Sequence, residues 1–348
     1  MKVTQSSMPL LDSEGKKIEA HAGGVIKQGN TFYWYGENKQ YTTGRNKIWT
    51  WGVKCYSSQD LVTWHDEGYI MPPSQDEGSW LHPSRHLDRP HIVYCPSTKK
   101  YVCWIKFSGK TEACFGIYVS ENLLGGYSTV RENFRPFGLE VGDFDIYVNS
   151  AGEGFLYFVN AHNGIAACRL TPDLCNVAGE YKMYYTGLCV PYCREGVTVA
   201  ELDGKLYMFT SGMTGYIPNP SEVALLSSPL GEIRVLGNPH VGDSTQTSFS
   251  SQISQVFKVG NGAIAIADRW IPCLKFKPGQ SEKMMRALAS CIDGRRYRSN
   301  IFEKMSLARY PWNCDRVNTS LSEYVWLPVE LNGGIPSIKW TDKFTLEM

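Results

Sequence analysis

Residues 197–212 read VTVAELDGKLYMFTSG, and their pattern of apolar and polar residues indicates the secondary structure that recurs along the chain. Apolar and polar residues alternate in two short runs, and the turn Asp203-Gly204 separates them. Alternation with a period of two is typical of a half-buried strand, and a short Gly-containing turn between two such runs predicts a β-hairpin. We therefore expect residues 197–212 to form two antiparallel strands.

Four more segments repeat this hairpin pattern. They are GGVIKQGNTFYWYGE (23–37), HIVYCPSTKKYVCWI (91–105), DIYVNSAGEGFLYFV (145–159) and SQVFKVGNGAIAIADRW (254–270). A further strand pair follows most hairpins, so each repeat would hold four strands. Self-similarity at about 50–70 residues with four strands per unit predicts a β-propeller, and five units predict five blades. A β-sandwich is the alternative, but it rarely needs 348 residues in one piece.

The C-terminal part must close the ring, because a propeller leaves no edge strand bare. The run YVWLPVELNGGIPSIKWTDKFTLE (324–347) supplies late strands that would complete blade 5. The segment GQSEKMMRALASCID (279–293), inside a long insertion, is the best candidate for a helix. We expect an all-β, five-bladed propeller over residues 1–348, as a single catalytic domain without a separate carbohydrate-binding module.

Composition limits the classes of function. Lys and Arg number 35 and Asp and Glu 34, which argues against a nucleic-acid-binding surface. No stretch approaches the roughly 20 apolar residues of a membrane span, and the N-terminus lacks the apolar core of a secretory signal. Eleven scattered cysteines, several in apolar runs, indicate buried thiols in a reducing compartment. We expect a cytoplasmic protein and leave its oligomeric state open.

Polar groups recur where each repeat begins. The first strand of a propeller blade lines the central channel, where a carboxylate is costly unless it has a partner or a function. The five repeats open with His21, Asp88, Asp143, Glu195 and Gln252. Glycoside hydrolysis needs one carboxyl that protonates the leaving oxygen and one group that activates water or attacks carbon. A third acid can raise the pKa of the proton donor. Glu195, Asp88 and Asp143 are enough to fill these three roles.

These openings, with the motifs around them, resemble a known family. The motifs are AHAGG (20–24), YWYGENK (33–39), LDRPHIVY (87–94), GDFDIYVNSAGEGFLYF (142–158), REGVTV (194–199), TSGMTGYIPN (210–219), SSQISQVF (250–257) and ADRW (267–270). In this order the chain resembles glycoside hydrolase family 43, a group of five-bladed propeller enzymes, over about residues 12–345. More narrowly it is similar to the branch that includes exo-β-1,3-galactanases.

The resemblance implies catalytic roles. Glu195 matches the general acid of the family, and Asp143 matches the aspartate that tunes the pKa of that acid. Gln252 matches a glutamine near the attacked carbon in the galactanase branch, and Asp88 stands where that branch has an essential glutamate. The usual base, an aspartate at the start of blade 1, is missing from AHAGG. Our hypothesis is that Asp88 activates the water while Gln252 orients it.

We also expect His21, Glu37, Tyr216, Asn219 and Arg269 to bind substrate. Tyr216 stands in SGMTGY at the position of a sugar-stacking Trp in the branch. We expect no required cofactor and no catalytic metal, and a structural cation in the central channel, held indirectly by His21, stays an open alternative.

Other motifs are set aside. His82 and His86 are four residues apart, but Pro83 disfavours a helix there, so we interpret the segment as a loop. Cys189 and Cys193 flank Pro191, and we infer no zinc site from them. The Gly-x-Gly triplets at 152–154 and 260–262 fit hairpin turns better than phosphate loops.

The leading interpretation is an exo-acting, inverting glycoside hydrolase. Its partner would be an oligosaccharide or polysaccharide of plant type, either β-1,3-galactan-like or containing arabinose and galactose. An α-L-arabinofuranosidase or galactofuranosidase on the same fold is one alternative. A non-catalytic carbohydrate-binding propeller is a second, because the base of blade 1 is missing. A mannoside phosphorylase is a third, in which Arg89, Arg194 and Arg269 would hold phosphate.

Overall fold

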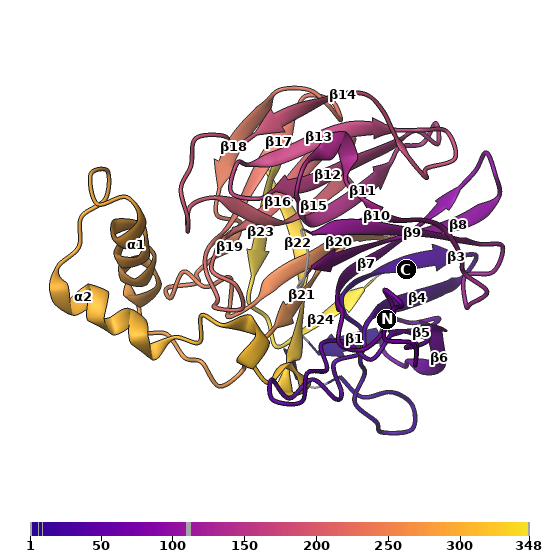
Figure 1. The fold of residues 1–348 in the computed structure, drawn as a ribbon, viewed down its shortest axis with the longest axis horizontal. Coiled ribbons are helices and arrows are strands. Elements are labelled where there is room, and N and C mark those ends of the chain that lie inside the picture. The colour runs from indigo at the N-terminus through magenta and orange to yellow at the C-terminus, as the bar shows by residue number, and fades with distance from the viewer. Residues whose placement is uncertain (1, 6, 9, 109–112, 347–348) are drawn as a thin grey trace.

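The computed structural model describes residues 2–5, 7–8, 10–108 and 113–346, and it confirms the five-bladed β-propeller (Figure 1). Blades 1 to 4 are antiparallel sheets of four strands each. Blade 1 consists of β3 (His21–Gln28), β4 (Thr31–Glu37), β5 (Val53–Ser58) and β6 (His65–Met71), and blade 2 of β7 (His86–Cys95), β8 (Lys100–Ser108), β9 (Cys114–Ser120) and β10 (Ser128–Phe134). Blade 3 consists of β11 (Val141–Val148), β12 (Gly154–Asn160), β13 (Ile165–Leu170) and β14 (Val177–Tyr184). Blade 4 consists of β15 (Arg194–Leu202), β16 (Lys205–Gly212), β17 (Ser221–Leu226) and β18 (Ile233–Gly237).

Blade 5 combines the two ends of the chain. Its inner strands are β20 (Gln252–Val259) and β21 (Gly262–Arg269), and the C-terminal run adds β22 (Glu323–Asn332) and β23 (Ile335–Lys339), as predicted. The short strand β19 (His240–Val241) lies parallel to β23. The sequence pattern did not predict the N-terminal contribution. In it, β2 (Ser7–Met8) pairs with β22 of this blade, while β1 (Lys2–Gln5) pairs with β24 (Lys343–Leu346) in a separate sheet of two strands.

The first strands of the blades form a closed ring. β3 contacts β7, β7 contacts β11, β11 contacts β15, β15 contacts β20, and β20 returns to β3. Apolar side chains fill the space between neighbouring blades. Between blades 1 and 5, for example, the rings of Trp34 and Trp326 meet edge to face at 4.9 Å, a favoured aromatic geometry. This packing fixes the relative positions of the five inner strands.

Every inner strand is irregular where it begins. The pairing register shifts between His21 and Gly24, Asp88 and His91, Val141 and Phe144, Glu195 and Thr198, and Ile253 and Gln255. A bulge bends the strand and re-aims a side chain. The backbone there turns left-handed in three blades, with φ of 49° at Ala22, 48° at Arg89 and 60° at Gly196. The polar residues that open the blades therefore lie within or directly beside a bulge.

One of these bulges requires glycine. A Cβ on Gly196 would lie 2.8 Å from Ser211 Oγ and 3.0 Å from Gln252 Nε2. Contacts that short would displace both side chains. The glycine of the REG motif thus lets blades 4 and 5 approach each other beside Glu195.

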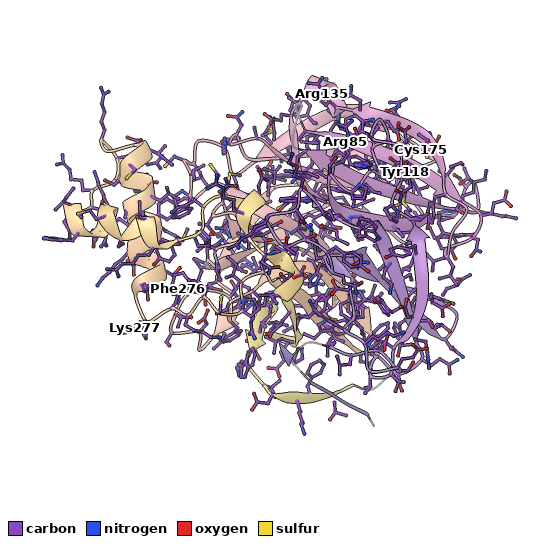
Figure 2. All side chains as sticks on the ribbon, turned by 60° about the horizontal axis from the view of Figure 1, so that its bottom comes forward. Arg85, Tyr118, Arg135, Cys175, Phe276 and Lys277 are labelled. Atoms are coloured by element: carbon purple, nitrogen blue, oxygen red, sulfur yellow. The ribbon has the colours of Figure 1, made fainter. Side chains whose placement is uncertain are left out.

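A helical insertion lies between β21 and β22. It holds α1 (Gln280–Ile292), which confirms the expected helix, and also α2 (Ile301–Ser306), which was not predicted. Phe276 and Lys277 mark the loop that leads from the propeller to α1 (Figure 2). Three 3-10 turns follow, η2 (Leu307–Arg309), η3 (Cys314–Arg316) and η4 (Thr319–Leu321). One more, η1 (Pro136–Gly138), precedes β11.

The cysteines, the 82–86 segment and the Gly-x-Gly turns are arranged as the sequence predicts. All eleven cysteines are free, and most are buried. The segment between His82 and β7 is a loop, and Gly152 and Gly260 lie in hairpin turns with positive φ. In the part of the chain that the structure describes, no helix is long and apolar enough to cross a membrane.

Candidate active site

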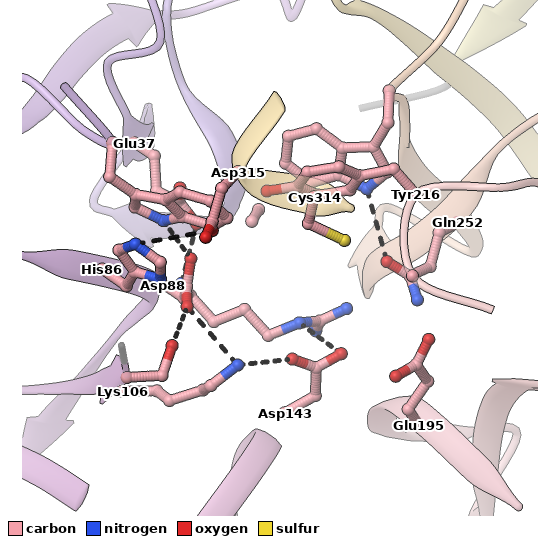
Figure 3. Close-up of a pocket in the computed structure, with 16 residues that line it drawn as sticks. Glu37, His86, Asp88, Lys106, Asp143, Glu195, Tyr216, Gln252, Cys314 and Asp315 are labelled. Carbon is pink, nitrogen blue, oxygen red and sulfur yellow. Dashed lines mark hydrogen bonds and ion pairs between the residues drawn. The ribbon is translucent and has the colours of Figure 1, made fainter. Parts of the chain in front are cut away.

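A pocket of about 280 Å³ opens where the inner strands begin (Figure 3). The bulged ends of β7, β11, β15 and β20 contribute to it, together with the ends of their neighbouring strands. Six of the nine residues predicted for the site line this pocket: Glu37, Asp88, Asp143, Glu195, Tyr216 and Gln252. The structure thus brings together polar residues that lie up to about 215 positions apart in the sequence.

Glu195 has the environment of a proton donor. Burial raises the pKa of its carboxyl to about 8, and the negative charge of Asp143 adds to this effect, whereas Lys106 and Arg89 oppose it. A carboxyl with such a pKa is protonated at neutral pH. Figure 3 shows the Glu195 carboxyl pointing into the pocket between Asp143 and Gln252.

Asp143 has the opposite environment. Its Oδ2 lies 3.2 Å from Arg89 Nε and accepts a hydrogen bond of 3.1 Å from the Gly196 amide, while its Oδ1 lies 3.6 Å from Lys106 Nζ. Burial by itself would raise the pKa of Asp143, but Arg89, Lys106 and the Gly196 amide outweigh it and hold the pKa below the usual value. The pair is therefore one neutral acid beside one carboxylate, the arrangement that acid catalysis needs.

Asp88 is held in place by three donors. Trp49 Nε1 donates to its Oδ1 at 2.6 Å, and Ser108 Oγ donates to its Oδ2 at 3.1 Å. Lys106 Nζ lies 3.4 Å from the same Oδ2. These three contacts fix the orientation of the Asp88 carboxyl at the pocket.

Glu37 lies behind Asp88 and is almost completely buried. Its Oε1 accepts a hydrogen bond of 2.9 Å from the backbone amide of Arg89, and its Oε2 lies 2.6 Å from Lys39 Nζ. Burial raises the pKa of Glu37 to about 7, Lys39 opposes this, and Asp88 adds to it. Glu37 therefore fixes the bulge that carries Asp88 and Arg89, in addition to lining the pocket.

Gln252 is oriented from both sides. Its Nε2 donates to Ser211 Oγ at 2.9 Å, and its Oε1 accepts from Trp270 Nε1 at 3.4 Å. Tyr216 lies between two indoles, with its ring centroid 4.8 Å from Trp270 and 6.2 Å from Trp49. Aromatic surfaces of this kind can stack on the apolar face of a sugar ring.

Three of the residues predicted to bind substrate, His21, Asn219 and Arg269, do not line this pocket. His21 is fully buried, its Nδ1 lies 2.9 Å from Asp268 Oδ1, and its ring stacks on Tyr324. Burial lowers the pKa of His21 to about 3. The other two residues also serve the scaffold. The Asn219 amide bonds both backbone groups of Gly212, and Arg269 Nη2 donates to the Phe249 carbonyl.

Several lining residues were missed. The strand register pairs Asp88 with Lys106 and Glu195 with Ser211, so the second strand of a blade ends beside the residue that opens the first. A polar residue near the end of an otherwise apolar strand, such as the lysine in YVCWIKF, is a sequence feature that could have indicated these pocket residues. Cys314 and Asp315 reach the pocket from η3, and no periodic pattern predicts that.

No cluster of three His, Cys, Asp or Glu side chains that could hold a metal ion occurs among the described residues. A cation in the channel stays a prediction.

The chain matches a family model described as Glycosyl hydrolases family 43 over residues 21–278. Among solved structures, a family 43 β-1,3-galactosidase is similar with a TM-score of 0.78 and 24% identity, over 99% of this chain and 63% of that chain. A variant of the exo-β-1,3-galactanase from Phanerochaete chrysosporium, solved with β-1,3-galactotriose, has a TM-score of 0.77 and 21% identity, over 100% of this chain and 69% of that chain. An exo-β-1,3-galactanase from Clostridium thermocellum has a TM-score of 0.73 and 24% identity, over 99% of this chain and 67% of that chain. A search of curated proteins gave no match. At these identities the likeness shows the fold, and this chain spans under two thirds of the first structure.

Proposed function

The chain belongs to glycoside hydrolase family 43, and we propose that it removes terminal galactose from β-1,3-linked galactan-type oligosaccharides with inversion of configuration. The observation that carries the proposal is Glu195, a carboxyl whose pKa is raised to about 8 beside a carboxylate whose pKa is lowered. A protein that only binds sugar has no need for this pair. The likeness to β-1,3-galactosidase and exo-β-1,3-galactanase structures supports the choice of sugar and linkage.

The proposed mechanism uses three groups of the pocket. The Glu195 carboxyl gives its proton to the glycosidic oxygen as the bond between that oxygen and the anomeric carbon breaks. Asp88 accepts a proton from a water molecule whose oxygen bonds to the anomeric carbon from the opposite face, with Gln252 orienting that water. The products are free galactose of inverted configuration and the shortened chain. Solvent then returns a proton to Glu195 and removes one from Asp88.

The pocket favours attack at a chain end. Its volume of about 280 Å³ suits one sugar ring better than a run of several. The phosphorylase alternative loses its phosphate site, since Arg194 donates to Thr210 Oγ1 and to the Thr210 carbonyl, and Arg269 bonds Phe249. Arg89, the third arginine, is engaged with Asp143.

The test offers the protein β-1,3-galactobiose, β-1,3-galactotriose, an aryl α-L-arabinofuranoside and an aryl β-D-galactofuranoside, with and without phosphate. The first sugar released is followed by the NMR signals of its anomeric proton. We expect galactose from the two galactosides, appearing first as the α-anomer, without a need for phosphate. First appearance of the β-anomer would contradict inversion. Cleavage of a furanoside alone would replace the proposed substrate, and binding without cleavage of any substrate would make the protein a lectin-like propeller.

A further inference from the structure

Lys106 joins the two halves of the proposed site. It lies near the end of β8, with its side chain 17% exposed. Its Nζ is 3.4 Å from Asp88 Oδ2 in blade 2 and 3.6 Å from Asp143 Oδ1 in blade 3 (Figure 3). One ammonium group therefore contacts both the carboxylate that would activate water and the carboxylate beside the acid.

We propose that Lys106 is a positioning residue, which binds Asp88 and Asp143 into one charge-balanced unit and so holds the proposed base in place relative to the acid. This inference rests on the proposed function, because the roles of Asp88 and Glu195 come from there.

The charges around Lys106 support this role. Asp88, Arg89 and His86 face it from β7, Asp143 faces it from β11, and Glu195 from β15. Burial would lower the pKa of Lys106, but Asp88 and Asp143 outweigh it and raise the pKa above the usual value, so the ammonium stays charged. With Glu195 neutral, two cations, Arg89 and Lys106, balance the two carboxylates.

Removing Lys106 would affect the two carboxylates that it contacts, Asp143 and Asp88, to different extents. Asp143 would keep Arg89 and the Gly196 amide and would stay ionised. Asp88 would keep only the neutral donors Trp49 and Ser108. Because Lys106 lowers the pKa of Glu195, that carboxyl would hold its proton to a higher pH. A change in charge at one lysine would thus reach both sides of the bond to be cleaved.

The alternative is a lysine that only stabilises the fold. Lys39 provides a matched control, since it is also buried and its Nζ lies 2.6 Å from a pocket carboxylate, that of Glu37. Glu37 Oε1 accepts a hydrogen bond from the Arg89 amide, so Lys39 acts on the same side of the pocket. The other hydrogen bonds of its Nζ are to the Trp49 carbonyl and Thr50 Oγ1, and not to Asp143 or Glu195 in the described part of the chain. Loss of either lysine should lower the thermal stability, while only Lys106 should change the titration of Glu195.

The experiment compares Lys106→Met, Lys106→Arg and Lys39→Met with the unmodified protein. Carboxyl ¹³C NMR follows the titration of Glu195 in the free protein, assigned by its loss in Glu195→Gln. We expect the Glu195 midpoint to move to higher pH in Lys106→Met, to return toward the original value in Lys106→Arg, and to stay unchanged in Lys39→Met. On β-1,3-galactobiose, kcat of Lys106→Met should fall roughly 10- to 100-fold, because small misplacements of catalytic groups have effects of that size. The value of KM should change far less.

The outcomes separate the two proposals. An unchanged Glu195 midpoint in a folded Lys106→Met variant overturns the role of Lys106, whether or not the protein cleaves galactosides. An unchanged kcat overturns it as well. If the unmodified protein cleaves no glycoside, the proposed function fails, and the NMR titration still decides whether Lys106 controls the proton affinity of Glu195.

Discussion

Arg89 Nε in blade 2 lies 3.2 Å from Asp143 Oδ2 in blade 3, and this ion pair keeps a carboxylate charged directly beside Glu195. The backbone amide of the same arginine donates to Glu37 in blade 1. One residue in a bulge thus connects three blades at the pocket. The electrostatics of the acid depend on the closed ring, because the charges that surround it come from separate blades.

Asp143→Asn should therefore weaken the acid. The negative charge of Asp143 raises the pKa of Glu195, so its removal lets Glu195 lose the proton at lower pH. We expect the alkaline limb of the pH profile of kcat/KM to move to lower pH, and kcat at neutral pH to fall by about 10²-fold. The control is Asp145→Asn, on the same strand. Asp145 is bonded to Thr198 and the Val199 amide, so its loss should lower stability without moving the alkaline limb. If the alkaline limb moved in Asp145→Asn but not in Asp143→Asn, the effect of Asp143 on the pKa of Glu195 would be contradicted.

Asp88→Asn tests how water is activated. The amide keeps the shape of the side chain but cannot accept the proton, so kcat should fall steeply, by roughly 10²–10⁴-fold. External azide, which needs no activation, should restore part of the activity and yield a glycosyl azide of inverted configuration. If only KM changes and azide has no effect, Asp88 binds substrate and another group is the base.

The sequence predicted much of this site for a physical reason. Inner strands of a propeller place their first residues at a common mouth, so aligning the hairpins was enough to bring Asp88, Asp143, Glu195 and Gln252 together. His21 shows the limit of that argument. His21 also opens a blade, but its Nδ1 lies 2.9 Å from Asp268 Oδ1 of the neighbouring blade, and its side chain is fully buried.

Other parts of the site depend on register or on irregular chain. Lys106 meets Asp88 only because the bulged β7 pairs with β8 in one register, and a run of apolar residues does not reveal which polar neighbour faces inward. Trp49 lies in the connection between β4 and β5, and Asp315 in η3. Their positions depend on packing of loops that carry no periodic pattern.

Gly196→Ala should impair the site more than the fold alone explains. The backbone at Gly196 has φ of 60°, and an added Cβ would press on Ser211 and Gln252. Gly204→Ala is the matched control, because Gly204 has φ of 69° in a turn and its Cβ would meet nothing within 4 Å. Both variants should lose about 1–2 kcal/mol from the left-handed backbone. Only Gly196→Ala should also lose kcat on β-1,3-galactobiose. Equal kcat values in the two variants would contradict the close contact.

Stability should depend on pH through Glu195. Its pKa is near 8 in the folded state and about 4.3 when the chain unfolds. Below about pH 4 both states are protonated and this contribution to stability is complete; as pH rises to 8 the unfolded state loses its proton first, so the contribution is lost. Glu195→Gln cannot ionise. Its Tm should exceed that of the unmodified protein by a few degrees at pH 8–9, and the difference should shrink toward pH 5. A constant difference across this range, measured by calorimetry, would contradict the raised pKa.

Whether Glu195 protonates the leaving oxygen is tested by comparing the activity of Glu195→Gln on two substrates with different leaving groups. On β-1,3-galactobiose, whose leaving hydroxyl needs a proton, the variant should lose roughly 10²–10⁴-fold in kcat. On 2,4-dinitrophenyl β-galactoside, whose leaving group is stable as an anion, the loss should be much smaller, with galactose binding unchanged in both cases. Turnover of β-1,3-galactobiose near the value of the unmodified protein, or an equal loss on both substrates, would contradict the assignment of Glu195 as the acid.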